Sequence, residues 1–116
     1  MLYVETELRP SGIEGLGLFV CTPVAQGTVV ANFGHGAHVL GEHAFLEAQA
    51  RGDELMLKSG VRWIGDVFLY NPQMGHEEHL NHSSSPNLLY HCGICFAKRA
   101  IRAGEELTVD YKYFLS

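Results

Sequence analysis

The sequence has few cysteines and no long apolar run, and each absence excludes a class of protein. Its longest apolar stretches, such as 16–21 interrupted by Gly17, fall far short of the roughly 18 to 20 residues of a membrane-spanning helix. Cys21, Cys92 and Cys95 are an odd number in a chain whose first residues carry acids rather than the positive flank of an export signal. We therefore expect no disulfide framework, no membrane contact and a reducing cytoplasm, or a nucleus if the source is a eukaryote or a virus.

Clustered positive charge is also missing. Eight Lys and Arg residues oppose 13 Asp and Glu residues, for a net charge of -5, and no basic run exceeds the pair Lys98-Arg99. Binding to a phosphate backbone depends on clustered cations. We expect no direct nucleic-acid binding, and a basic partner fits better, although a modest negative charge also simply keeps a protein soluble.

What the sequence does have is a series of short apolar runs between turn residues. Its 116 residues, 47% of them hydrophobic, suffice for a single domain over 1–116. The pattern predicts a mostly-β fold with one helix at 43–51, closed by Gly52, and one or two helical turns within 73–80. Turns are expected at 9–12 and at Ser59-Gly60, and an irregular stretch at 34–41. The predicted strands are 3–6, 18–21, 29–33, 55–58, 61–64, 67–70, 88–90, 94–97 and 107–111.

The first candidate site is Gly15-Leu16-Gly17, between a turn and a strand. Two glycines let the backbone approach a ligand closely, because neither has a side chain to keep it away. A turn that merely needs a positive φ explains the same residues. A dinucleotide fingerprint is excluded, since the third glycine and the following helix are missing.

Two polar segments complete the candidate site. The stretch 81–87, Asn-His-Ser-Ser-Ser-Pro-Asn, lies between apolar residues, so its side chains should be partly buried and hydrogen-bonded, unless it is an ordinary turn. The stretch 104–111, Gly-Glu-Glu-Leu-Thr-Val-Asp-Tyr, predicts a turn and a strand ending at Tyr111. The Tyr111 hydroxyl could orient an amine in a pocket; alternatively, Tyr111 and Tyr113 are strand residues packed on the core.

A zinc-binding interaction domain is a weaker alternative. His76, His79 and His82 lie three residues apart, with Cys92 and Cys95 nearby. If Cys92 and Cys95 enter a strand, however, residues three apart point to opposite faces. We therefore expect no metal site.

Three segments, in their order and spacing, closely resemble the SET-domain protein lysine methyltransferases. They are Gly15-Leu16-Gly17-Leu18-Phe19, the segment 80–87 and the segment 104–111. The resemblance extends over about residues 3–114. It implies a SET-type β-clip fold of small curled sheets, with one short helix and a threaded carboxy-terminal segment that brings Asn81, His82 and Tyr111 together.

The resemblance also implies the chemistry of each candidate residue. The cofactor would be S-adenosyl-L-methionine and the substrate a lysine in a protein, in a basic segment. Tyr111 would be the catalytic residue, and Asp110 or Glu106 would attract the lysine unless both are solvated. The cofactor would be bound by Gly15, Leu16, Gly17, Asn81 and His82, and the lysine channel lined by Tyr113 and Phe114.

Three departures from the family pattern bear on this interpretation. Glu78-His79 stands where an arginine-aromatic pair is common, and Ser84 replaces a frequent zinc-binding cysteine. The sequence ends at Ser116 without the cysteine-rich segment that often closes the channel. We expect Phe114 and Leu115, or a second copy in a homodimer, to form that wall. A non-catalytic SET-like binding module remains the main alternative.

Overall fold

The computed structural model describes residues 1–34, 37–52, 60–64, 67–70 and 75–115. Short strands dominate, as the sequence predicts, with one helix of ten residues, α1 (Glu42–Arg51), a short helix α3 (Lys112–Leu115) and a 3-10 turn η1 (His76–His79). The strands are β1 (Thr6–Pro10), β2 (Leu16–Val20), β3 (Val29–Asn32), β4 (His38–Leu40), β5 (Gly60–Ile64), β6 (Val67–Tyr70), β7 (Asn81–His82), β8 (Leu88–His91), β9 (Ile94–Ala97) and β10 (Thr108–Val109).

The strands of the described residues form four small sheets rather than one large one. Strands β1 and β2 make an antiparallel hairpin, β3-β9-β8 and β4-β6-β5 make two antiparallel sheets, and β7 pairs with β10 in parallel. The parallel pair joins residues 27 positions apart, Thr108 with Asn81 and Val109 with His82. Parallel strands need a crossover between them, so this pair is made only by the complete tertiary fold.

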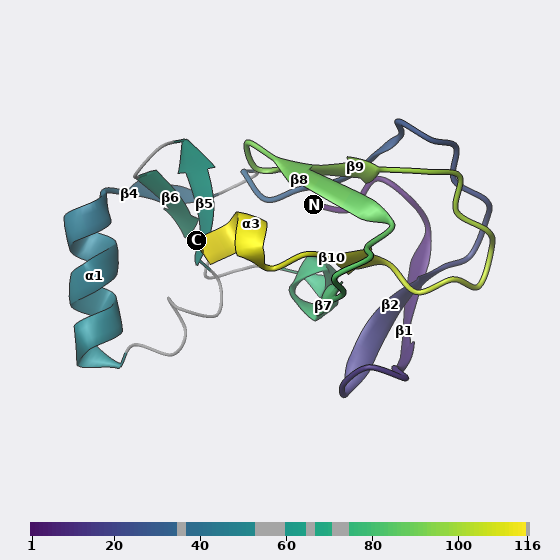
Figure 1. The fold of residues 1–116 in the computed structure, drawn as a ribbon, viewed down its shortest axis with the longest axis horizontal. Coiled ribbons are helices and arrows are strands. Elements are labelled where there is room, and N and C mark those ends of the chain that lie inside the picture. Colours follow the sequence, from purple (N-terminus) through teal and green to yellow (C-terminus); the bar gives the residue numbers. More distant parts are fainter. Residues whose placement is uncertain (35–36, 53–59, 65–66, 71–74, 116) are drawn as a thin grey trace.

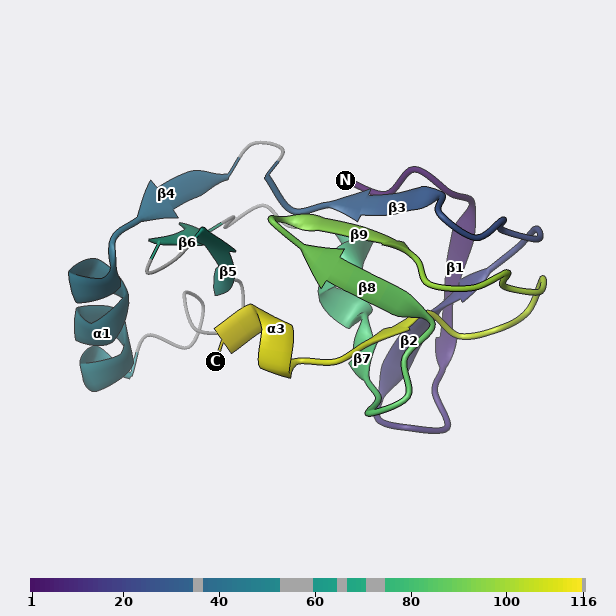
Figure 2. The same ribbon diagram turned by 45° about the horizontal axis from the view of Figure 1, so that its top comes forward.

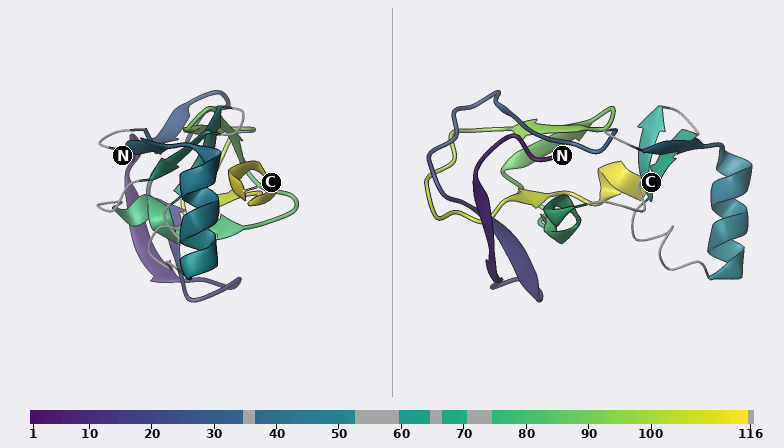
Figure 3. Two further views of the ribbon diagram at one scale, coloured as in Figure 1. Left: turned by 90° about the vertical axis from the view of Figure 1, so that its left-hand side faces the viewer. Right: turned by 180° about the vertical axis from the view of Figure 1, so that it is seen from behind.

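Figure 1 shows an elongated molecule with α1 and the β4-β6-β5 sheet at one end and the β1-β2 hairpin projecting near the other. Between them, the chain runs from β10 into α3 beside β7. Figure 2 presents the face of the β3-β9-β8 sheet beside this crossing. The view from behind in Figure 3 again places α1 at the far end, away from β7 and β10. The candidate site therefore lies in the middle of the molecule, where sheets from both halves of the chain meet.

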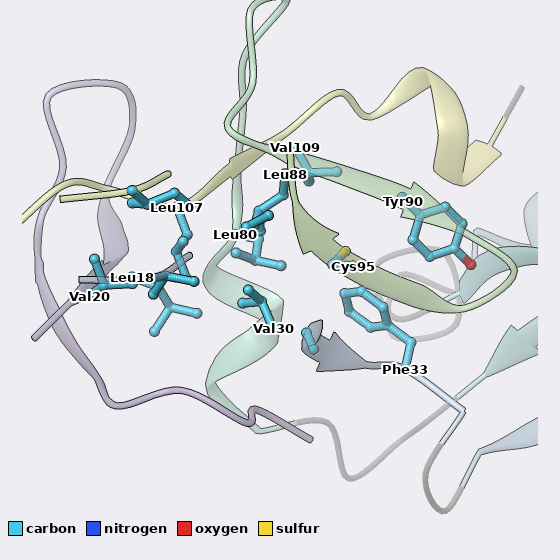
Figure 4. Close-up of a cluster of buried hydrophobic side chains, with 14 of the residues drawn as sticks. Leu18, Val20, Val30, Phe33, Leu80, Leu88, Tyr90, Cys95, Leu107 and Val109 are labelled. Atoms are coloured by element: carbon cyan, nitrogen blue, oxygen red, sulfur yellow. The ribbon is translucent and has the colours of Figure 1, made fainter. Parts of the chain in front are cut away.

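The core lies between β2, the β3-β9-β8 sheet and the carboxy-terminal strand (Figure 4). Phe33 and Tyr90 meet edge to face, with ring centroids 5.9 Å apart. In β2, β8 and β9 the buried side chains occupy alternate positions, as a half-buried strand requires, whereas 107–110 are buried at every position. Those with almost no exposed surface include Leu18, Val20, Val30, Leu88, Cys95, Ile101, Leu107 and Val109.

Helix α1 confirms the predicted helix to within one residue. It begins at Glu42 and ends before Gly52, whose φ of 71° gives the left-handed C-cap expected there. The predicted turns within 73–80 correspond to η1, in the part of that range the structure describes. Among the described residues, no helix is both long and apolar enough to cross a membrane.

Several predicted boundaries are wrong. The first strand is Thr6–Pro10 rather than 3–6, so Arg9 and Pro10 end a strand instead of forming a turn. Proline is tolerated here because this is the edge of a two-stranded hairpin, where its missing N–H breaks no essential pairing.

Tertiary pairing also changes three later predictions. Strand β4 lies in the stretch predicted to be irregular, because β6 gives it a partner. Gly60 is part of β5, which pairs with β6; the predicted strand 55–58 lies outside the described residues. The last strand ends at Val109, so Tyr111 is in a turn and Tyr113 in α3.

A candidate active site where three chain segments meet

The carboxy-terminal segment 104–109 is held on two sides. Its first half lies along β2, where the N–H of Leu107 donates to the carbonyl of Leu18 at 2.8 Å. Its second half is β10, paired with β7. Two chain segments that carry candidate residues, 15–17 and 81–82, are therefore brought to the same strand.

Asn87 fixes the loop between β7 and β8 to this strand. Its side chain is buried, donates to the carbonyl of Glu106 at 2.8 Å and accepts from the N–H of Thr108 at 2.9 Å. The N–H of Ser83 bonds the carbonyl of Val109 at 3.1 Å. Since Ser83 and Asn87 both bond the strand, the segment 81–87 is held against it at two points. The prediction of buried, bonded polar groups is confirmed for Asn87.

The side-chain amide of Asn81 has one orientation. Three acceptors surround its nitrogen: Oε2 of Glu106 at 2.8 Å and the backbone carbonyls of Glu14 and Leu16 at 3.1 and 3.3 Å. Only the NH2 end can face three acceptors. The Oδ1 atom therefore points away from them, and no described residue donates a hydrogen bond to it.

Gly15 and Gly17 require glycine for different reasons. Gly15 has a φ of 50°, the left-handed region, and a Cβ there would meet nothing within 4 Å, so its backbone borders open space. At Gly17 a Cβ would lie 2.2 Å from Oε2 of Glu106. Both interpretations of the Gly-x-Gly segment thus apply: a turn that needs positive φ at Gly15, and a close approach at Gly17, made by a carboxylate of the same chain. Leu16 between them is exposed.

Tyr111 is attached to both neighbours of Asn81. Its hydroxyl donates to the carbonyl of Leu80 at 2.5 Å, and its N–H donates to Nδ1 of His82 at 3.1 Å. The two rings also lie against each other, with centroids 5.2 Å apart. The structure therefore brings Asn81, His82 and Tyr111 together, as the resemblance implies.

The electrostatic surroundings of Tyr111 are negative. Burial raises the pKa of Tyr111 above its usual range, and the nearby carboxylates of Glu14 and Glu106 raise it further. The hydroxyl is consequently protonated at neutral pH and can donate a hydrogen bond. It is still 41% exposed, so it is not the packed core residue of the alternative interpretation.

The remaining predicted residues lie around this centre. Asp110 is buried, with Nδ1 of His82 at 3.8 Å and Nζ of Lys112 at 3.7 Å, so it is not a solvated residue. Tyr113 is exposed, with Nζ of Lys112 5.1 Å above its ring. The side chain of Phe114 lies outside the described part of the structure.

The positions of Cys92 and Cys95 do not favour the zinc-binding alternative. Cys92 is exposed at the tip of the β8-β9 hairpin, whereas Cys95 is buried and burial raises its pKa to about 12. A thiol so difficult to ionise is a poor ligand, since metals bind the thiolate. Among the described residues no three His, Cys, Asp or Glu side chains are placed to hold a metal ion.

Sequence reasoning missed Ser11 and the role of Asn87. The Ser11 hydroxyl donates to the Glu106 carboxylate at 2.8 Å and accepts from the N–H of Ile13 at 2.9 Å. Ser11-Gly12 resembles any turn in the sequence. The hydrogen bond from Ser11 to Glu106, 95 positions away, cannot be recognised from the residues around Ser11. Asn87 was recognised only as part of a motif.

Comparison with known proteins agrees with this arrangement. The profile of the SET domain matches residues 15–112. The chain belongs to the SET-domain family. Members of the SET-domain family are generally protein lysine methyltransferases and generally use S-adenosylmethionine. The matched range includes Gly15, Asn81, His82 and Tyr111, but not Tyr113 or Phe114.

A solved structure confirms the SET fold. This SET domain is similar to a humanized mutant of the Chaetomium thermophilum Polycomb Repressive Complex 2 bound to the inhibitor GSK126, with a TM-score of 0.71 and 18% sequence identity. The similarity covers 98% of this chain but 16% of the other, so the chain corresponds to a small part of that protein's length. At this identity the likeness establishes the fold alone.

Proposed function

We propose that this SET domain transfers a methyl group from S-adenosyl-L-methionine to the side-chain amine of a lysine in a protein substrate. The observation that carries the proposal is the meeting of Asn81, His82 and Tyr111 where β7 pairs with β10, with the Tyr111 ring against the His82 ring and the Tyr111 N–H bonded to Nδ1 of His82. Asn81 and His82 come from one segment and Tyr111 from another, 29 positions after His82, and a purely structural turn would not need them together.

The residues present fit a cationic cofactor with an amino-acid moiety. Asn81 Oδ1 is an outward-facing acceptor suited to an ammonium group, and the backbone at Gly15 borders open space. The carboxylates of Glu14 and Glu106 make the surroundings negative. When bound, the cofactor would supply a sulfonium methyl group, whose carbon–sulfur bond breaks as a nitrogen–carbon bond forms, leaving a neutral thioether. Gly15, Leu16, Gly17, Asn81 and His82 would hold it.

Tyr111 would act by orientation rather than as a base. Displacement at the methyl carbon needs the lone pair of a neutral amine, aligned with the breaking bond, so the lysine ammonium must first lose its proton to solvent. A phenol held at its backbone by His82 and at its hydroxyl by Leu80 is a preorganised dipole beside the reacting atoms. Its remaining lone pair can accept from the amine.

The substrate lysine would lie in a basic segment. The chain has a net charge of -5, and Glu14, Glu106 and Asp110 surround Tyr111 and His82. Negative surroundings increase the encounter rate with cationic segments. Tyr113 and Phe114 would line the path of the lysine side chain.

The proposal is tested by incubating the purified chain with cofactor labelled in its methyl group and a cell extract, then identifying labelled proteins by mass spectrometry. Methyl-lysine that depends on the chain is the expected result. A non-catalytic SET-like binding module would bind S-adenosylhomocysteine in a calorimeter but leave no labelled lysine. Absence of both binding and label would contradict both interpretations.

A further inference from the structure

The carboxylate of Glu106 is partly buried without a cationic partner among the described residues. Its two oxygens share the one hydroxyl proton of Ser11, at 2.8 and 2.9 Å, and Oε2 accepts from Asn81 at 2.8 Å; no described Lys or Arg lies within ion-pair distance. Its neighbour Glu105, in contrast, pairs with Arg99 at 3.1 Å. A carboxylate removed from water needs an opposite charge or hydrogen-bond donors, and for Glu106 the side-chain donors are Ser11 and Asn81, so its position is tied to those two residues.

Glu106 also joins three distant parts of the chain. Ser11 belongs to the turn after β1, Asn81 to β7, and Gly17 to β2, where the absence of a side chain leaves room for the Glu106 carboxylate. Ser11 in turn organises its own turn by accepting from the N–H of Ile13. The network therefore links the Gly15–Gly17 backbone to the Asn81 side chain.

We propose that Glu106, held by Ser11, is a positioning residue that fixes the amide of Asn81 with Oδ1 facing outward and thereby sets the affinity for the cofactor. This inference rests on the proposed function, because Asn81 is the group assumed to bind the amino-acid moiety. Glu106 itself need not touch cofactor or lysine.

The physical reason is the exclusive acceptor character of an ionised carboxylate. Together with the carbonyls of Glu14 and Leu16, the Glu106 carboxylate surrounds the Asn81 amide nitrogen with three acceptors and no donor. Rotating the amide by 180° would place Oδ1 against three oxygens. Hydrogen bonds to a charged group are also stronger than neutral ones. Glutamine at 106 keeps the shape but loses the charge and offers an NH2 group, which permits the flipped amide.

The test compares Glu106→Gln and Ser11→Ala with the matched control Glu105→Gln, which removes the same charge from the adjacent position. Calorimetry with S-adenosylhomocysteine gives Kd, and a lysine peptide assay gives separate KM values for cofactor and peptide. We expect Glu106→Gln to raise the Kd about tenfold, the effect of one charge-assisted contact. Ser11→Ala should raise it less, and the double variant should resemble Glu106→Gln alone, since Ser11 acts through Glu106. Peptide KM should stay within about twofold, and Glu105→Gln should match wild type.

A second readout needs no cofactor. The side-chain NH2 resonances of Asn81 in a ¹⁵N spectrum should shift and exchange faster in Glu106→Gln and Ser11→Ala, and remain unchanged in Glu105→Gln. Unchanged resonances, or an unchanged Kd with only a lower Tm, would overturn the positioning role while leaving the proposed function intact. Failure of the wild type to bind S-adenosylhomocysteine would overturn both.

Discussion

Nδ1 of His82 accepts a hydrogen bond from the backbone N–H of Tyr111, with 3.1 Å between the nitrogens. Acceptance at Nδ1 requires that the neutral ring carry its proton on Nε2. The imidazole therefore fixes the backbone from which the catalytic candidate projects. The sequence predicted His82 as a cofactor-binding residue; the structure gives its side chain this additional positional role.

Replacing His82 should show whether its side chain positions the Tyr111 backbone or only packs against the Tyr111 ring. We expect His82→Ala to slow methyl transfer by about tenfold and to weaken cofactor binding, because the Tyr111 backbone loses one anchor. His82→Asn places an amide oxygen near the Nδ1 position and should recover part of the rate. Single-turnover rates check this, with His43→Ala as the control, since His43 is exposed and pairs with Glu47 within α1. Equal losses in both alanine variants would contradict the assignment.

Tyr111→Phe should lower turnover by about 10²-fold or more while leaving cofactor Kd nearly unchanged. The lost hydroxyl also ends the bond to Leu80, so a decrease of about 1 kcal/mol in unfolding free energy should accompany it. Tyr3→Phe is the control, because Tyr3 is an exposed tyrosine of the amino-terminal segment and has no assigned role in the candidate site.

The ionisation of Tyr111 can be measured independently. Because burial and then Glu14 and Glu106 raise its pKa, the absorbance difference between wild type and Tyr111→Phe should show a phenol that ionises above the ordinary range near pH 10. Equal turnover in wild type and Tyr111→Phe would remove Tyr111 from the catalytic role.

Gly17→Ala should destabilise the fold by about 1–3 kcal/mol, because the added Cβ would lie 2.2 Å from Oε2 of Glu106 and must displace it. Gly12→Ala is the matched control: a Cβ there meets nothing within 4 Å, and its φ is not positive. Thermal melting should show a lower Tm for Gly17→Ala alone. A similar Tm in both variants would mean that Glu106 moves aside without cost.

Glu77 should contribute to stability in a pH-dependent way. Its buried Oε1 lies 2.7 Å from the α-ammonium of Met1. Burial alone would raise the pKa of Glu77, but hydrogen bonds from the ammonium and from backbone N–H groups, with the ammonium charge, lower it overall. A carboxyl whose pKa is lower in the folded state stabilises the fold above its unfolded pKa, and this contribution is lost as pH falls through the folded pKa.

Urea unfolding between about pH 6 and pH 3 tests this ion pair. Glu77→Gln should cost about 1 kcal/mol near neutrality, a modest value because the ammonium is half exposed, and should reduce the loss of stability in acid. Glu78→Gln, an exposed neighbour, should retain the wild-type pH dependence. Parallel acid profiles for Glu77→Gln and wild type would contradict the prediction.

The chain should form a twofold dimer through the face that carries Tyr113. Tyr111 and Tyr113 are both exposed beside the site, and an aromatic surface left open to water favours association. Sedimentation at tens of micromolar should give twice the chain mass, and Tyr113→Glu should give a monomer. Tyr3→Glu, a change at an exposed tyrosine of the amino-terminal segment, should remain a dimer. A wild-type monomer that is active would show that the chain closes its own channel.

The sequence alone determined the fold family, the helix at 43–51 and the identity of the segments that meet. Helix α1 was predictable because propensity and the Gly52 cap are local properties, and both polar segments carry their chemistry in consecutive residues. The boundaries it missed, at β1 and β4 and at the end of β10, depend on which strand supplies the partner.

Only the tertiary structure decided how the site is held together. The parallel pairing of β7 with β10, the bond from Ser11 to Glu106 and the capture of the 104–109 strand by Asn87 all join residues far apart in sequence. Of the two acidic residues expected from the resemblance to attract the lysine, Asp110 and Glu106, the second is hydrogen-bonded to Ser11 and Asn81. Such roles depend on hydrogen bonds between segments that are distant in the sequence. The order of the residues does not specify these bonds, because donor and acceptor come together only in the complete tertiary structure.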